Sequence, residues 1–168
     1  KRFGETYALF YIANTDYRQP PHPLNQTIGL VTSNAPWGPW SPAGDKGRVL
    51  ASSADPSHWT HGMQVVNPAV LSFGGRYLLY FKSRIKGQPG TVYGVAVWET
   101  LTGPYALPDA PLTSAVVTIE DACAFVWDGR IRLVTTDNHG AVTGIRGGGA
   151  LWSSDDGLHF DPREVLLA

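Results

Sequence analysis

The feature that most constrains the fold of this chain is a unit that occurs three times, each time as strand-like runs that begin at a glycine. The runs are 4–11, 29–33 and 38–40 in the first copy, 75–81, 94–98 and 103–105 in the second, and 129–134, 149–153 and 157–160 in the third. The last two glycines are nine positions apart in the first two copies and eight in the third, so the copies share a frame. Repetition at this period is typical of propeller blades, solenoid turns or arrays.

Composition agrees with a single domain of short strands and turns. The 168 residues include 19 Gly and 13 Pro, both above average, and 43% are hydrophobic, which is enough for a core. No window keeps a helical apolar period, so we expect almost no helix, and no apolar stretch is long enough to span a bilayer. A net charge of −1 gives no electrostatic reason to expect nucleic acid or a membrane surface as a partner.

Two residue types are expected to be buried. The single cysteine, Cys123, lies in an apolar run and is expected to be a small core residue. Tryptophans recur in the repeats and are expected to pack between them: Trp37, Trp40, Trp98, Trp127 and Trp152.

Each copy is interpreted as a four-stranded antiparallel meander, which predicts an all-β fold of propeller blades within one domain. The units cover about 1–52, 53–114 and 115–168. The predicted strands are 68–73, 77–82 and 92–98 in the second unit, with a short fourth after Tyr105, and 122–127, 131–136 and 149–153 in the third. The first unit has no first strand ahead of Phe3. Closed propellers usually have four to eight blades, so we expect a partial propeller of about three blades, incomplete or completed by another segment or a second chain.

The meander also fixes which loops share a face. The first strand of a blade begins on the side where the second strand ends, so the segments 14–26, 52–67, 83–91, 115–121 and 137–148 should lie on one rim. They are long and polar, whereas the turns on the opposite side are only Gly74-Gly75 and Asp128-Gly129. Long loops on one rim predict that this rim is the working face.

Glu120 is the strongest catalytic candidate because it lies directly before the first strand of the third unit. The inner strand of a propeller begins there, at the central cavity. Partial burial of a carboxyl group favours the protonated form that a general acid needs. The alternative is that Glu120 or Asp121 only ends a strand and hydrogen-bonds a neighbouring loop.

A Gly-rich loop on the same rim offers partners for sugar hydroxyls. Asp137 and His139 open this loop, which reaches Arg146. Carboxylate, imidazole and guanidinium groups bind hydroxyls readily. The alternative is an Asx-type turn with a solvated histidine.

Further rim residues could contact a substrate. Trp59 offers an aromatic platform beside His61, and the histidine spacing gives only a weak zinc pattern, so no metal ligand set is predicted. Lys82, Arg84 and Lys86 form a basic cluster that either binds an acidic sugar substituent or is simply solvated.

The pattern of a carboxylate ahead of an apolar strand, a Gly turn and a Tyr-rich strand resembles the five-bladed β-propeller glycoside hydrolases, the family 43-like arabinanase/xylosidase and invertase-like superfamily. In that superfamily the general-acid Glu stands two residues ahead of a strand-opening Pro, and nine residues separate this Pro from the Tyr-rich strand. Pro68 to Tyr77 and Ala122 to Ile131 are both nine positions, so the resemblance places Glu120 at the general-acid position. As a repeat pattern it covers essentially the whole chain.

The chain also departs from that superfamily. Ala69 stands where the superfamily has a second carboxylate that tunes the acid, with Asn67 nearby as a hydrogen-bonding group. The superfamily's base or nucleophile Asp lies on the first strand of the first blade, ahead of Lys1. Asp16 and Asp137 are substitutes for it by face alone, although glycoside hydrolysis usually uses two carboxyl groups.

The resulting hypothesis is a glycoside hydrolase, or part of one, that acts on a plant, algal or microbial saccharide. Glu120 and Asp137 are its catalytic candidates, and its predicted substrate-binding residues are Asn67, Trp59, His61, Arg84, Asp121, His139 and Arg146. The resemblance implies no required cofactor, permits a structural calcium ion in the central cavity, and favours a secreted or periplasmic location. The alternatives are a sugar-binding propeller without catalysis and a structural partial propeller that self-associates.

Overall fold

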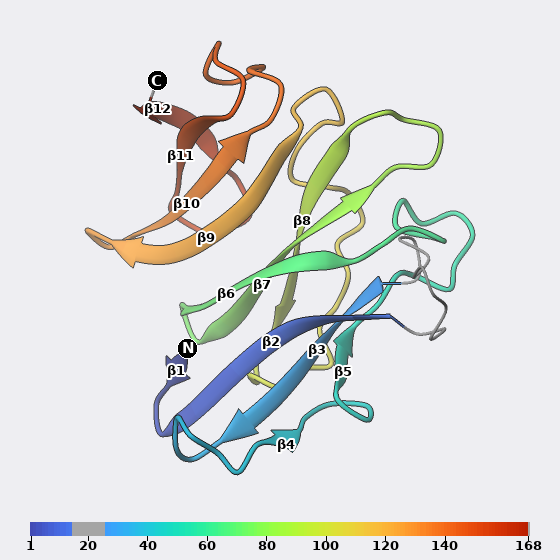
Figure 1. Ribbon diagram of the computed structural model, residues 1–168, viewed down its shortest axis with the longest axis vertical. Coiled ribbons are helices and arrows are strands. Elements are labelled where there is room, and N and C mark those ends of the chain that lie inside the picture. Colours follow the sequence, from blue (N-terminus) through green and yellow to red (C-terminus); the bar gives the residue numbers. More distant parts are fainter. Residues whose placement is uncertain (15–25, 168) are drawn as a thin grey trace.

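The computed structural model describes residues 1–14 and 26–167, with side chains up to Asp161. These residues form three antiparallel sheets and no helix (Figure 1). The first sheet contains β1 (Arg2–Phe3), β2 (Thr6–Asn14), β3 (Gln26–Ser33), β4 (Ser41–Pro42) and β5 (Arg48–Leu50). The second contains β6 (Val66–Phe73), β7 (Arg76–Arg84) and β8 (Thr91–Trp98), and the third contains β9 (Ile119–Trp127), β10 (Arg130–Asp137), β11 (Gly148–Ser154) and β12 (Asp161–Leu167).

The predicted all-β fold of blade-like sheets is confirmed, with two differences at the blade edges. Arg2 and Phe3 pair with Tyr7 and Thr6, so the first blade does contain the end of a first strand. The expected fourth strand of the second blade is reduced to one bridge between Val97 and Ala106. Two prolines in 107–112 explain this loss, because proline has no N–H to donate to a sheet edge.

Two hydrophobic clusters lie between successive blades, and β7 contributes to both. Leu79 and Phe81 belong to the cluster shared with the first blade, whereas Leu78 and Tyr80 belong to the cluster shared with the third. All four are fully buried. This is the alternation that a strand imposes on successive side chains, and it shows that the second blade is covered on both faces.

The outer faces of the first and third blades are not covered in this way, which corrects two expectations. Cys123 is exposed, and Trp127 is 62% exposed, because both point to the face of β9 that is turned away from the second blade. Trp37 is 84% exposed, and Trp40 and Trp98 are also exposed. Of the five tryptophans expected in the core, Trp152 is buried, and its indole N–H donates to Thr135 Oγ1 at 2.8 Å.

The loops are divided between two sides of the molecule as the meander predicts. In Figure 1 the hairpin turns β6–β7 and β9–β10 lie at the left, and the longer loops β7–β8 and β10–β11 lie at the opposite ends of the same strands. Within the described residues, no helix has the length and apolar character needed to cross a membrane.

Candidate functional site

The inner strands β6 and β9 begin with the same irregularity. In β6 the pairing with β7 shifts between Val66 and Ala69, and in β9 the pairing with β10 shifts between Glu120 and Cys123. The residue inside each bulge has a left-handed backbone, with φ of 53° at Asn67 and 54° at Asp121. Asn and Asp tolerate this conformation better than other side-chain-bearing residues. The two positions are therefore structurally equivalent, in agreement with the nine-residue spacing in the sequence.

The two bulges are joined by polar contacts between the second and third blades. Asn67 Nδ2 donates to Asp121 Oδ1 at 3.3 Å. The Tyr93 hydroxyl oxygen accepts from the Ala122 N–H at 3.2 Å, and burial raises the pKa of Tyr93 to about 12. Tyr93 therefore stays a neutral phenol at physiological pH. The sequence did not identify it as a site residue, and its place in β8, the third strand of a repeat, gave no signal for one.

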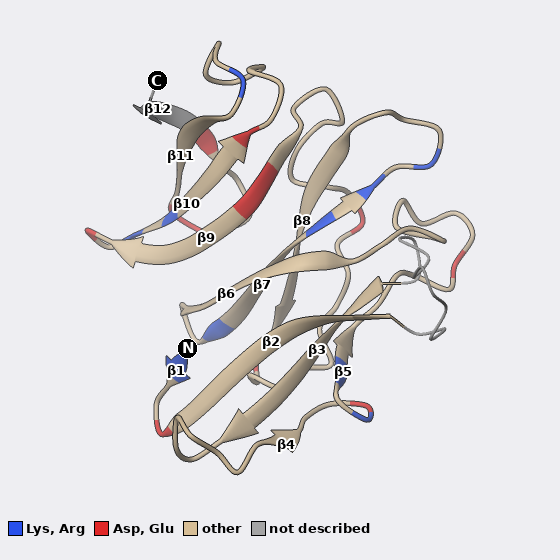
Figure 2. Ribbon diagram, in the orientation of Figure 1, with Lys and Arg blue, Asp and Glu red and all other residues tan. Residues whose placement is uncertain are grey.

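Glu120 forms an ion pair with Lys82, whose Nζ lies 2.9 Å from Glu120 Oε1. The two side chains are 28% and 12% exposed, so the pair is largely shielded from water. Figure 2 shows the acidic segment at the start of β9 and the basic segments at the end of β7 that hold these residues. The sequence placed Lys82 only in a basic cluster with Arg84 and Lys86. The expectation of a partly buried Glu120 agrees with the structure, but its neighbour is an ammonium group.

Asp137 is also buried, but its environment differs from that of a catalytic carboxylate. It is fully buried, and Oδ1 accepts from the N–H groups of Gly140 and Ala141 at 2.9 and 3.1 Å. Oδ2 accepts from Val142 N–H and from both N–H and Oγ1 of Thr143, at 2.8 to 3.0 Å. Burial opposes ionisation, but these hydrogen bonds outweigh it and lower the pKa of Asp137. The geometry favours the Asx-type alternative, in which Asp137 organises its own loop.

The remaining predicted residues are spread along the rim. Trp59 is half-buried, stacks on Phe81 with ring centroids 5.8 Å apart and donates its indole N–H to Pro108 O at 2.9 Å, so it packs into the core. His61 Nδ1 lies 3.0 Å from Ser53 O. The exposed predicted residues are Arg84, His139 and Arg146. Among the described residues, no hydrogen bond or ion pair joins any of these five to Glu120. Asp16 lies outside the residues that the structure describes.

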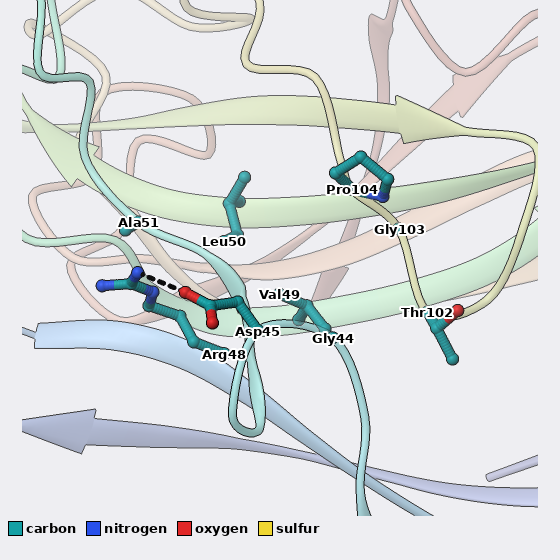
Figure 3. A pocket seen from close by; sticks show the side chains of 9 residues that line it. All are labelled: Gly44, Asp45, Arg48, Val49, Leu50, Ala51, Thr102, Gly103 and Pro104. Atoms are coloured by element: carbon teal, nitrogen blue, oxygen red, sulfur yellow. Dashed lines mark hydrogen bonds and ion pairs between the residues drawn. The ribbon is translucent and has the colours of Figure 1, made fainter.

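Two cavities have walls from more than one blade. A cavity of about 290 Å³ is lined by strands of all three blades, including Ala8, Ala69 and Ala124. Ala69 occupies the position where the resemblance expects a second carboxylate, and it forms an apolar wall there. A cavity of about 400 Å³ lies between the β4–β5 loop and the segment around Pro104, with Asp45 and Arg48 paired at 2.9 Å (Figure 3). Neither cavity brings Glu120 a second acidic side chain.

No three His, Cys, Asp or Glu side chains in 1–14 and 26–161 come together in a way that could hold a metal ion. The calcium ion that the resemblance permits would therefore need ligands beyond these side chains.

The fold is similar to those of several glycoside hydrolases. A family 117 glycoside hydrolase of the marine bacterium Zobellia galactanivorans superimposes with a TM-score of 0.71 and 17% identity, over 98% of this chain and 53% of that one. A family 43 β-xylosidase/α-arabinofuranosidase from a compost metagenome gives 0.74 and 20% identity, over 96% and 56%. A family 32 β-fructofuranosidase of Bombyx mori gives 0.73 and 13% identity, over 98% and 33%.

These likenesses confirm the fold that the sequence resemblance predicted, that of five-bladed β-propeller glycoside hydrolases. This chain spans 53%, 56% and 33% of the lengths of these three structures. No protein-family model and no curated protein sequence matches the chain.

Proposed function

We propose that this chain is part of a glycoside hydrolase in which a saccharide binds where the second and third blades meet, with Glu120 as the proton donor. The observation that carries the proposal is the convergence of Glu120, Lys82, Asn67 and Asp121 at the start of two inner strands. This position matches the general-acid position of the superfamily that the sequence resembles. The similar structures named above are glycoside hydrolases, which supports the same class of reaction.

Lys82 favours the carboxylate form of Glu120, which is the form left after proton donation. Glu120 must carry a proton when the glycosidic bond is cleaved, so it has to take up a proton from water and give up its ion pair with Lys82 before the transfer. Once the proton has moved to the leaving oxygen, Glu120 is a carboxylate again and can re-form its ion pair with Lys82, as the structure shows it at 2.9 Å. The pair thus stabilises the state that follows proton donation.

Asp137 does not fit the role of the second carboxyl group in the reaction. All five hydrogen bonds to this side chain come from its own loop, and it has no exposed surface. Asp121 is exposed and adjacent to Glu120, but it bonds to Asn67 and belongs to the same bulge. We propose that the base or nucleophile comes from a part of the protein beyond these described residues.

A sugar-binding propeller without catalysis is the second candidate. Ala69 at the position of the tuning carboxylate and the enclosed Asp137 favour it. In this case Asn67 and Asp121 bind hydroxyl groups, and Glu120 is a structural partner of Lys82.

The test compares Glu120→Gln with the unmodified protein on two substrates, in both cases as the full-length protein that includes the base or nucleophile. The variant removes the proton donor, so hydrolysis of an alkyl glycoside or disaccharide should fall about 10²- to 10⁴-fold. An activated aryl glycoside, whose leaving oxygen needs little protonation, should lose much less. Glu99→Gln is the matched control, because Glu99 is exposed and lies outside the site.

Equal rates for Glu120→Gln and the unmodified protein on both substrates would remove Glu120 from the mechanism. If neither protein cleaves any glycoside but both bind sugar equally, the sugar-binding candidate is correct. Thermal unfolding of each variant separates loss of chemistry from loss of fold.

A further inference from the structure

A cavity of about 810 Å³ lies at the outer edge of the second blade, on the opposite side of the sheet from the inner strand β6. Its walls come from β8, from the segment 106–112 and from the segment 158–160 of the third blade. Most of the lining is apolar, including Leu107, Pro111 and Phe160. Ligand sites in proteins have this character, with a few well-placed polar groups among apolar walls.

The polar groups of this cavity are the side chains of Asp109 and His159 and the backbone of β8. Tyr93 turns its N–H and C=O away from β7, toward Thr113 Oγ1 at 3.0 Å and Leu112 N–H at 2.7 Å. Val97 turns the same groups toward Ala106, at 3.4 and 3.3 Å. Val95 lies midway between them in the same register, so its N–H and C=O also point outward.

Val95 differs from Tyr93 and Val97, because the segment between Ala106 and Leu112 moves away from the edge of β8. No hydrogen bond from another described residue reaches its outward N–H or C=O. Val95 lines the cavity, so one donor and one acceptor stand side by side in a mostly apolar pocket.

The unpaired part of the β8 edge, at Val95, is too short for an added β-strand. Edge pairing by a peptide needs several consecutive residues, and the edge is already occupied on both sides of Val95. The ligand must therefore present one acceptor next to one donor within a compact group. Two adjacent hydroxyl groups of a pyranose do this, since each hydroxyl can donate and accept. The carbon face of the sugar ring then packs on the apolar walls.

We propose that this cavity is a second carbohydrate site, which binds a sugar through an adjacent hydroxyl pair at Val95. One hydroxyl oxygen accepts from Val95 N–H, and the neighbouring hydroxyl donates to Val95 C=O. The site goes beyond the proposed function, because it shares no residue with the Glu120 site and needs no catalysis. It would hold a saccharide against the outer wall of the second blade.

The test follows backbone amide resonances of the ¹⁵N-labelled protein during titration with xylobiose and with β-1,3-galactobiose. We expect a saturable shift of the Val95 amide with at least one of them. Permethylated xylobiose and permethylated galactobiose keep the ring shapes but have no hydroxyl donor, so they should not give this shift. Ala110→Trp fills the cavity and should weaken the Val95 response at least about tenfold, whereas Ala54→Trp, at an exposed position that does not line the cavity, should leave it unchanged.

Three outcomes would overturn the proposal. One is a Val95 amide that does not move with either disaccharide. Another is an equal shift with the permethylated sugars, which means apolar contact without hydroxyl recognition. The third is an unchanged response in a folded Ala110→Trp variant. Shifts confined to Asn67 and Asp121 would leave the Glu120 site standing and refute only the second site. The sugar comparison uses the unmodified protein, so it decides the question even if Ala110→Trp fails to fold.

Discussion

At the scale of single residues, the acidic side chains near the rim differ in their partners. Glu120 pairs with a lysine of the neighbouring blade, Asp121 accepts from an amide, and Asp137 accepts five hydrogen bonds inside one loop. A carboxylate whose acceptor positions are all occupied by its own loop stabilises that loop and is closed to substrate. This difference is why Glu120 and Asp121 remain in the proposed site and Asp137 does not.

Asp137→Asn should destabilise the protein by about 3 kcal/mol, because an amide keeps one acceptor oxygen and turns its NH₂ group toward buried N–H donors. The measurement is the free energy of unfolding in urea at neutral pH. Asp109→Asn, at an exposed position, is the matched control and should change stability by less than about 0.5 kcal/mol. A variant as stable as the control would contradict the loop-organising role.

The pH dependence of stability gives a second readout for Asp137. Its pKa is lowered in the folded protein, so its contribution is present above the unfolded value of about 3.9 and is lost as pH falls through the folded pKa. Below about pH 4 the unmodified protein should therefore lose stability more steeply than Asp137→Asn. Parallel acid profiles of the two proteins would argue against an ionised Asp137.

The sequence predicted where Glu120 lies but not what lies beside it. The nine-residue frame places Glu120 ahead of an inner strand, whereas β9 begins at Ile119, so that Glu120 is its second residue and lies just before the bulge. Its pairing with Lys82 joins two blades, and a repeat pattern carries no information on which side chains of neighbouring blades meet. For Asp137 the sequence offered a catalytic carboxylate, with an Asx-type turn as the alternative, and the hydrogen bonds favour the alternative.

At the scale of elements, the two bulges determine how the inner strands begin. Each inserts a left-handed residue between the pairing partners of the inner strand. In β9 this lets Glu120 and Asp121 both contact the second blade, whereas consecutive residues of a regular strand point to opposite faces. The sequence predicted the strands themselves to within a few residues. It did not predict the bulges, because Asn and Asp are compatible with both a left-handed backbone and an ordinary turn.

Comparing Ala and Gly at Asp121 isolates the backbone contribution of the bulge. Both variants lose the hydrogen bond to Asn67, but Ala also has to adopt a φ of 54°, which costs about 1 kcal/mol. Asp121→Ala should therefore be less stable than Asp121→Gly. At Ser72, an exposed residue of β6 beyond the bulge, the order should reverse, because Gly weakens a regular strand by roughly 0.5–1 kcal/mol. Urea unfolding of the four variants measures both differences, and the same order at both positions would refute the left-handed bulge.

At the scale of the whole molecule, the chain has one blade covered on both faces and two covered on one. Leu9 is 53% exposed on β2 and Trp127 is 62% exposed on β9, and each lies on the face of its blade that is turned away from the second blade. Exposed apolar patches of this kind mark surfaces that pack against other protein. The sequence could not separate the covered face from the open one, because both carry apolar side chains at the same spacing, and this is why Cys123 and Trp127 were expected in the core.

These open faces predict that the 168-residue chain associates with itself in solution, because each apolar face gains by leaving water. Sedimentation velocity over a concentration series should show species larger than the monomer. Leu9→Glu or Trp127→Glu puts a charge into the contact and should raise the dissociation constant at least about tenfold. Trp37→Glu is the matched control, since Trp37 is 84% exposed but lies in the β3–β4 loop, outside both faces, and should have no effect. A chain that stays monomeric at every concentration, or a Trp37→Glu variant that dissociates as readily as Trp127→Glu, would show that these two faces are not the contact surfaces.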